Sequence, residues 1–373
     1  MLKEVTSAFA LVLIALLAVS GHKVLLGEEK TLSQVDLLSF FEEEEPRGEG
    51  LRKVSIESVD QWQRKRRQIE KRILHVMGPF PAFSEPLVIE VTIEEQLPDF
   101  LRRKIRYTSG TGDSVTAWLL IPETGASKLP AIVALHPTAP TGKDVVAGIG
   151  HRPGRNYGEE LARRGYVVLA PDILTAGERV LPGKGAYETN GFDRDNPQWS
   201  MMGKMAWDHR RGVDVLASLP QVDGDRIGTI GHSLGGYNAI WLAAFEPRIK
   251  AAVSSCGWAS LSGAPSPFHF SRREWFVHFP ALRLYLSAGI TPFDFHEAVA
   301  LIAPRAFLNY STKQDQFFPN WQDIAQDAEQ VRQVYRLHKS EENFRFVLGE
   351  GEHDFPDAVR LQAYAFLDKF LRR

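Results

Sequence analysis

Residues 226–236, with the sequence RIGTIGHSLGG, constrain the fold of this chain more than any other segment. The apolar residues of a short buried strand lead up to Ser233, and residues 237–245 after it have the composition of a helix. Gly231 and Gly235 lack Cβ atoms, so the strand and the helix can approach each other closely. The sequence therefore predicts a nucleophile elbow, in which a strained backbone holds the Ser233 hydroxyl clear of the sheet, and Ser233 is our candidate nucleophile.

A serine hydroxyl needs a base, and the base needs a carboxylate that orients it. Where the nucleophile stands on such an elbow, the acid and then the base follow it along the chain. His353 follows the predicted strand 344–348 in the loop before the last helix, so we assign His353 as the base. Asp315 follows the preceding predicted strand, 306–310, and is the predicted acid. Asp294 is the alternative acid, because a carboxylate after an earlier strand would also reach the imidazole.

The tetrahedral intermediate of acyl transfer carries a negative oxygen, which two N–H donors must face. We expect the first donor to be the backbone N–H of Leu234, at the positive end of the helix that follows Ser233. The second is expected from the loop after the first parallel strand, where Pro137 has no N–H and Thr138 is the predicted donor. His136, in the same loop, is interpreted as a residue that braces the loop and not as a second base.

Two patterns divide the rest of the chain. Alternating or apolar segments up to residue 121 are typical of antiparallel strands, and from residue 131 strands alternate with helices. The predicted strands are 87–93, 101–107, 115–121, 131–135, 166–170, 226–230, 251–255, 306–310 and 344–348. The predicted helices are 58–77, 157–164, 201–219, 235–245, 324–338 and 356–371. We therefore expect an α/β fold, with a mostly parallel, twisted sheet of about eight strands, helices on both faces and an N-terminal helical extension.

The N-terminal segment differs from this pattern. Residues 8–19 form an unbroken apolar run, preceded by Lys3 and followed by Ser20 and Gly21. Such a run is shorter than the roughly 20 residues that span a bilayer, and it is typical of a signal peptide. An uncleaved anchor that extends to Leu26 and a buried first helix are the alternatives. We expect an exported protein, periplasmic or secreted, that contacts the membrane only through an uncleaved leader.

The predicted leader, strands and helices divide the chain into four parts. We expect a signal peptide or membrane anchor at 1–20, a linker at 21–54, a helical extension with entry strands at 55–108, and a catalytic domain at 109–373. The linker assignment rests on the four consecutive glutamates 42–45, because such a charge run is typical of a solvated segment.

The composition favours a small-molecule or carbohydrate ligand. The net charge is −2, which gives no reason to expect nucleic acid, and the sequence leaves the oligomeric state open. Cys256 is the single cysteine, so no intrachain disulfide forms, and its apolar surroundings predict a core residue. Metal-binding and nucleotide-binding motifs with the required spacing are not found, so we predict no cofactor and no metal.

The substrate pocket is expected from two long loops, 173–200 and 257–296. Aromatic residues are frequent in the second loop, which would form a cap over an acyl group, a stacking surface for a sugar, or a layer packed on the core. Arginines near the pocket would be able to grip a carboxylate, but such arginines more often form structural ion pairs. We assign a substrate contact to none of Arg179, Arg210, Arg211, Arg272 and Arg273.

Residues 55–373 resemble the α/β-hydrolase superfamily, and within it the dienelactone hydrolase-like and acetylxylan esterase-like proteins. Besides the elbow, the resemblance is carried by 77–81 (MGPFP), 164–172 (RGYVVLAPD), 177–179 (GER), 222–228 (VDGDRIG) and 303–305 (APR). It implies the hydrolysis of carboxylic esters by Ser233, Asp315 and His353 through an acyl-enzyme intermediate. Dienelactone hydrolases carry cysteine where this chain has Ser233, and acetylxylan and glucuronoyl esterases carry Gln or Arg where it has Leu234.

Three functions are consistent with these features. The first is a serine esterase that acts on small or carbohydrate-linked esters. The second is a serine peptidase of the prolyl-oligopeptidase type, but the roughly one hundred residues before the core are too few for the propeller that gates those peptidases. The third is a binding protein with the same fold, which would keep all three residues of the triad without using them. We therefore predict the esterase.

Overall fold

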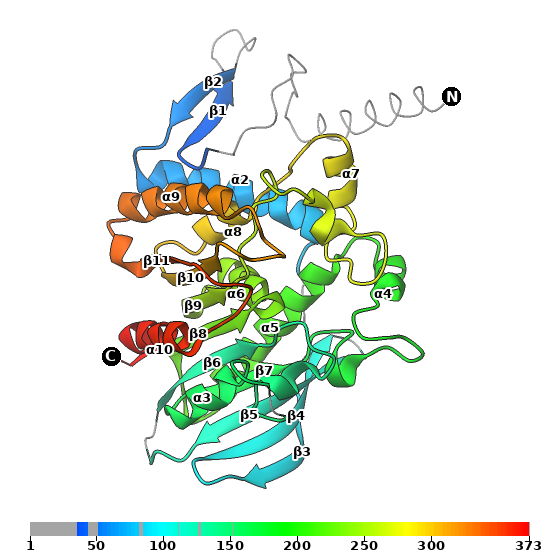
Figure 1. Ribbon diagram of the computed structural model, residues 1–373. Helices are drawn as coiled ribbons and strands as arrows, with labels where there is room; N and C mark the ends of the chain where they lie inside the picture. The colour runs from blue at the N-terminus through cyan, green and yellow to red at the C-terminus, as the bar shows by residue number, and fades with distance from the viewer. Residues whose placement is uncertain are drawn as a thin grey trace.

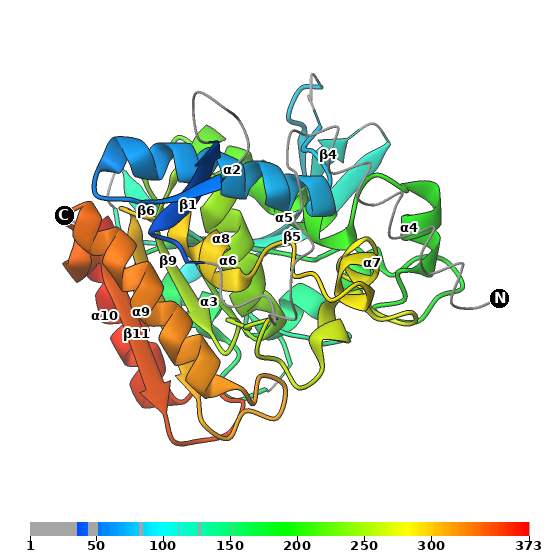
Figure 2. The same cartoon turned by 90° about the horizontal axis from the view of Figure 1, so that it is seen from above.

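The computed structural model describes residues 36–43, 51–81, 85–110, 112–125, 128–150 and 152–372. A central sheet lies between two layers of helices, and a small hairpin lies beside helix α2 (Figures 1 and 2). The predicted leader, 1–20, lies outside the described residues. Across the described ranges, no helix combines the length and the apolar character that crossing a membrane requires.

Nine strands form the main sheet of the described chain, in the order β11-β10-β9-β8-β6-β7-β5-β4-β3. Strands β6 to β11 pair in parallel, whereas β3, β4 and β5 form an antiparallel edge that joins β7. Their bounds are β3 Ile89–Gln96, β4 Phe100–Gly110, β5 Asp113–Pro122, β6 Leu129–Leu135, β7 Val167–Pro171, β8 Val222–His232, β9 Ile249–Ser255, β10 Ala306–Thr312 and β11 Phe344–Gly349. The predicted α/β fold with a mostly parallel sheet is confirmed, and the sheet has nine strands where about eight were expected.

The helices of the described residues cover both faces of this sheet. They are α2 Val59–Met77, α3 Tyr157–Arg163, α4 Asn190–Asp195, α5 Met201–Ser218, α6 Leu234–Phe245, α7 Leu282–Ser287, α8 Phe295–Ala300, α9 Trp321–Leu337 and α10 Asp357–Leu371. Side chains of α3 and α10 share one apolar core, and those of α2, α5, α6, α8 and α9 share the other. The short helices α4, α7 and α8 lie in loops for which the sequence predicted no helix.

Strand β6 shows how the sheet separates the two cores. Ile132 and Ala134 belong to the core with α3 and α10, whereas Ala131, Val133 and Leu135 belong to the opposite core. Successive side chains of a strand point to opposite faces, and both faces are covered here, so every position of the strand is apolar or buried.

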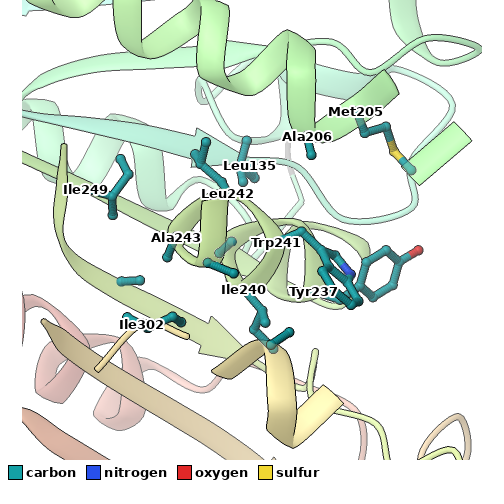
Figure 3. Close-up of a cluster of buried hydrophobic side chains, with 14 of the residues drawn as sticks. Leu135, Met205, Ala206, Tyr237, Ile240, Trp241, Leu242, Ala243, Ile249 and Ile302 are labelled. Carbon is teal, nitrogen blue, oxygen red and sulfur yellow. The ribbon is translucent and has the colours of Figure 1, made fainter. Parts of the chain in front are cut away.

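Helix α6, which begins directly after Ser233, is surrounded by other elements. Every residue from Leu234 to Ala244 is buried. Figure 3 shows Trp241 and Leu242 of this helix among side chains of β6, α5 and β9. The position of the helix N-terminus beside Ser233 is therefore fixed by core packing.

The segment 21–54, interpreted as a linker, contains a hairpin in its described part. Strand β1 (Ser39–Glu43) pairs antiparallel with β2 (Leu51–Ser55). Just before β1, Leu37 is 1% exposed, and its N–H donates to Oε1 of Gln330 on α9 at 3.2 Å. Where the sequence predicted a solvated linker, the described residues therefore form a paired hairpin, which the apolar Leu37, outside the glutamate run, anchors to α9.

A buried ion network joins α5 to the turn between β4 and β5. Arg179 Nη1 lies 2.7 Å from Asp208 Oδ2, and Lys204 pairs with both Asp208 and Asp113. Burial acts to raise the pKa of Asp208, but Lys204 and Arg179 outweigh it and lower the pKa to about 2. Asp208 is therefore ionised, and Arg179 has the structural role expected of most arginines in these loops.

The next residue on α5, His209, makes stability depend on pH. Burial lowers the pKa of His209 to about 3, whereas the pKa of a histidine in an unfolded chain is about 6.5. Below pH 6.5 the unfolded chain binds a proton that the folded protein does not accept, so stability is lost as the pH falls from about 6.5 to about 3. We expect His209→Leu to reduce the slope of unfolding free energy against pH, between pH 4 and 6, by up to about 1.4 kcal/mol per pH unit.

Urea denaturation at several pH values measures this slope. His75→Leu, at an exposed position of α2, is the matched control and should leave the slope as in the parent protein. Equal slopes for the parent protein and His209→Leu would contradict the prediction.

Candidate active site

Ser233 lies in the turn between β8 and α6. Its φ of 57° and ψ of −120° form a conformation that residues with a Cβ rarely adopt. The Ser233 N–H donates to the carbonyl of Ser255 on β9 at 2.8 Å, and the Ser233 carbonyl accepts from the Tyr237 N–H at 3.1 Å. The strained turn is therefore held by the neighbouring strand and by the first turn of α6.

Two glycines make this turn sterically possible. A Cβ added to Gly235 would lie 1.9 Å from the carbonyl oxygen of Leu135, and one added to Gly231 would lie 2.1 Å from the carbonyl oxygen of Gly235. All of these neighbours are backbone atoms of the sheet and the helix, which cannot turn aside. The close approach expected from the sequence is thus present at both positions.

Three side chains that are far apart in the sequence meet beside this turn. Ser233 Oγ lies 2.8 Å from His353 Nε2, and His353 Nδ1 lies 2.7 Å from Asp315 Oδ2. Because a carboxylate only accepts, His353 Nδ1–H donates to Asp315, and in the neutral form of the imidazole Nε2 accepts from the Ser233 hydroxyl. The structure brings the three predicted residues into one hydrogen-bonded line.

The Asp315 carboxylate is fixed by its own loop. It is 3% exposed, and its Oδ1 accepts from the N–H groups of Phe317 and Phe318 at 2.8 and 3.0 Å. These bonds hold Oδ2 toward His353. The loop follows β10, and the loop that carries His353 follows β11, so adjacent parallel strands deliver the two side chains to the same edge of the sheet.

The alternative acid, Asp294, has a different position. Its side chain caps helix α8, and it accepts hydrogen bonds from the N–H groups of Leu261, Ser262 and Phe295 at 2.7 to 2.9 Å. It therefore ties the start of the loop 257–296 to its end, and the carboxylate that contacts His353 is that of Asp315.

The two predicted oxyanion donors come from two different segments of the chain. The Leu234 N–H is the first of α6, and Thr138 lines the same pocket as Ser233. Within the described residues, neither N–H donates a hydrogen bond to another protein group. A carbonyl oxygen of a bound substrate would therefore find both donors available.

Two further histidines near the turn are neutral. Burial lowers the pKa of His136, whose Nδ1 contacts the Pro137 carbonyl at 2.8 Å and whose Nε2 accepts from the Ile173 N–H at 3.3 Å. His136 therefore braces its loop, as the sequence indicated. Burial, followed by Arg155, lowers the pKa of His232 well below its usual value, so His232 does not compete with His353 for a proton.

Ser233 and His353 line a pocket of about 440 Å³. Trp275 and Phe317, which are 45% and 50% exposed, form part of its wall. Exposed aromatic rings of this kind present faces on which a flat or apolar part of a ligand stacks.

The two loops expected to form the pocket have different roles. The loop 257–296 supplies lining residues such as Trp275, whereas no described residue of 173–200 lines the pocket. The first loop instead supports the second, because Thr189 N–H donates to the Trp275 carbonyl at 3.2 Å and the rings of Tyr187 and Phe276 lie 5.0 Å apart.

The arginines of these loops and of α5 also have different roles. Three of the five that the sequence singled out form ion pairs: Arg179 with Asp208, Arg210 with Glu246, and Arg211 with Asp214. Arg272 lines the pocket with Ser233, and Arg273 does not. Sequence reasoning missed Arg152 and Arg155, which also line it. Their position in the sequence could have indicated them. Both follow the first parallel strand, and folds of this kind bind ligands at the edge of the sheet where the parallel strands end.

Among the residues that the structure describes, two groups of side chains bring potential metal ligands within 4.8 Å of one another, and both already make other contacts. In the first group, burial raises the pKa of Cys256 to about 12, so the thiol is protonated beside Asp315 and His353. In the second group, which also includes His296 and Asp327, Asp294 accepts backbone hydrogen bonds at the start of α8. We assign neither group to a metal.

Cys256 is 1% exposed, in agreement with the core position expected.

Comparison with known proteins gives matches over most of the chain. The pattern of the dienelactone hydrolase family matches residues 116–269, and that of the BAAT / acyl-CoA thioester hydrolase C-terminal family matches residues 209–363. The putative hydrolase YtaP of Bacillus subtilis is 26% identical over 312 residues, which cover 82% of this chain and all of that protein.

Two esterases are also similar. The 4-O-methyl-glucuronoyl methylesterase 1 of Wolfiporia cocos is 28% identical over 196 residues, 46% of each chain. The solved glucuronoyl esterase from Solibacter usitatus superposes with a TM-score of 0.66 at 20% identity, over 84% of this chain and 94% of that one. The likeness to the solved structure is one of fold.

Alanine at Gly235 tests the packing of the turn. Because its Cβ would lie 1.9 Å from the Leu135 carbonyl oxygen, we expect Gly235→Ala to displace α6 and to destabilise the protein by about 1–3 kcal/mol or more. Thermal unfolding measures the loss. Gly224→Ala is the control, since a Cβ there meets nothing within 4 Å. A melting temperature of Gly235→Ala equal to that of the control would refute this account of the turn.

Proposed function

We propose that this chain is a serine esterase of the α/β-hydrolase superfamily, which cleaves carboxylic esters through an acyl-enzyme intermediate. The hydrogen-bonded line from Ser233 through His353 to Asp315, with Ser233 and His353 in the lining of a pocket, carries this proposal. An imidazole that is aligned by a carboxylate and touches a serine hydroxyl is the arrangement that acyl transfer needs.

The reaction has two steps of the same kind. Ser233 Oγ attacks the ester carbon while His353 Nε2 takes the hydroxyl proton, and Asp315 stabilises the imidazolium that forms. The N–H groups of Leu234 and Thr138 hold the negative oxygen of the tetrahedral intermediate. Its collapse gives the alcohol the proton from His353 and leaves the acyl group on Ser233. A water molecule, deprotonated by His353, then releases the acid and restores the serine.

The substrate class that we propose is a small or carbohydrate-linked ester. Trp275 and Phe317 support it, because exposed aromatic rings in a pocket wall suit the face of a sugar ring. The similarity to proteins named as glucuronoyl esterases points in the same direction. We also infer export, from the apolar run of residues 8–19.

An assay of two substrate types tests the reaction. We expect hydrolysis of p-nitrophenyl acetate, and of one or more of the acetylated, feruloylated and uronate methyl esters of sugars. An aminoacyl p-nitroanilide should remain intact. Cleavage of the anilide at a similar rate would favour a peptidase instead, and failure to cleave any ester or anilide would favour a binding protein.

Removing the nucleophile should abolish turnover. We expect Ser233→Ala to lower kcat by about 10⁴-fold or more, because the attacking atom is lost, while the melting temperature changes little. Stopped assays with p-nitrophenyl acetate and thermal unfolding measure the two quantities. Substantial ester hydrolysis by the purified variant would rule out Ser233 as the nucleophile.

A pair of carboxylate variants separates the acid from its alternative. Asp315→Asn should lower kcat by about 10⁴-fold, since an amide does not stabilise the imidazolium or keep the imidazole in the required tautomer. Asp294→Asn should lower stability by about 1–3 kcal/mol, through its lost backbone hydrogen bonds, and should change kcat far less. The opposite result, with kcat lost in Asp294→Asn, would move the role of the acid to Asp294.

A further inference from the structure

The pocket that contains Ser233 has a cationic wall. Arg152, Arg155 and Arg272 are among its lining residues, and the described lining includes no aspartate or glutamate. Positive side chains in a pocket with partly apolar walls attract anions more strongly than they do at an open surface.

Arg155 is already neutralised from outside the pocket. Its Nη1 lies 2.8 Å from Asp354 Oδ1. Arg152 is exposed and donates from Nη1 to the Thr138 carbonyl at 3.4 Å, which places it beside one proposed oxyanion donor. Within the described residues, Arg152 forms no ion pair with a carboxylate.

Arg272 is half-buried and has few hydrogen bonds. Of its five N–H donors, Nη2 donates to Nδ1 of His269 at 3.1 Å, and no described carboxylate pairs with it. Burial lowers the pKa of His269 to about 4, so the imidazole is neutral and can accept this bond. The guanidinium also packs against the ring of Trp275, with 5.4 Å between its Cζ and the ring centroid.

Three other arginines that are removed from solvent have several acceptors each. Arg179 and Arg360 pair with carboxylates, and Arg305 donates to three backbone carbonyls. Burial lowers the pKa of Arg272 as it lowers that of Arg305, but Arg272 has no comparable set of acceptors among the described residues. His269 and Trp275 orient the Arg272 guanidinium, and its other N–H donors have no acceptor among the described residues. A guanidinium in this state can bind an anion.

We propose that Arg272 and Arg152 form an anion subsite, which binds a carboxylate or sulfonate group of the ester substrate while its ester carbonyl meets Ser233. This inference rests on the proposed esterase function and adds to it a preference for anionic over neutral esters. The bound carboxylate or sulfonate accepts hydrogen bonds from the free N–H donors of Arg272, and it orients the substrate in the pocket.

Matched esters test the charge preference. On the acyl side, p-nitrophenyl butyrate is compared with mono-p-nitrophenyl succinate and p-nitrophenyl 3-sulfopropanoate, which distinguish a carboxylate from a sulfonate. On the alcohol side, 4-acetoxybenzamide is compared with 4-acetoxybenzoate. We expect kcat/KM for an anionic ester to exceed that of its neutral partner by about tenfold or more on one of the two sides, and the preference to fall with added salt.

The variants Arg272→Gln and Arg152→Gln should reduce this ratio by about tenfold or more. Arg273→Gln is the matched control, because Arg273 is the next residue in the chain and does not line the pocket with Ser233. It should keep the ratio of the parent protein. Equal kcat/KM values for charged and neutral esters on both sides, or the same ratio in Arg272→Gln and Arg273→Gln, would overturn the subsite.

Binding separates failure of this inference from failure of the proposed function. Calorimetry with Ser233→Ala measures binding of 4-acetoxybenzoate and mono-p-nitrophenyl succinate without turnover. If the parent protein hydrolyses none of the esters, the esterase proposal fails, while binding that requires Arg272 would still support the anion subsite. If neutral esters are hydrolysed and neither anion binds more tightly than its neutral partner, the subsite fails and the esterase stands.

Discussion

The hydrogen bond from the Ser233 N–H to the Ser255 carbonyl, 2.8 Å long, ties a strained turn to the strand beside it. The turn keeps its shape because α6 is buried on all sides and because Gly235 lies against the Leu135 carbonyl, where a Cβ does not fit. The position of the serine hydroxyl is therefore a property of the whole core. His353 and Asp315 stand on loops that follow the adjacent strands β11 and β10, so the same sheet aligns all three side chains.

Burial decides which groups near Ser233 carry charge. It lowers the pKa values of His232, His269 and His278, and it raises that of Cys256, so these side chains are neutral near physiological pH. One imidazole, that of His353, contacts the serine hydroxyl. Among the described lining residues, the other charged side chains are arginines, which is why charge, besides shape, enters the proposed choice of substrate.

Local patterns in the sequence account for much of the fold. Helix α2 starts after Ser58 as predicted, because Ser58 and Gln61 form a capping box, and it ends at Gly78. The alternation of strands and helices predicted the sheet, and the glycines around Ser233 predicted the turn. Patterns of this kind did not reveal the hairpin near Leu37, since its anchor is a contact with Gln330 on α9, far away in the sequence. They also missed α8, a short helix of six residues that Asp294 caps.

For the site, the sequence by itself determined the residue types and their order along the chain: a serine on an elbow, then a carboxylate, then a histidine. It left Asp294 and Asp315 as alternatives, and it did not show which arginines face the serine. Only the tertiary structure decided these points, because both depend on distances between loops that follow different strands. Asp315 reaches His353 while Asp294 caps a helix, and Arg272 faces the pocket while Arg179 is buried against Asp208. Sequence patterns describe neighbours along the chain, whereas the choice among candidate partners is made by the packing of segments that are distant in the sequence.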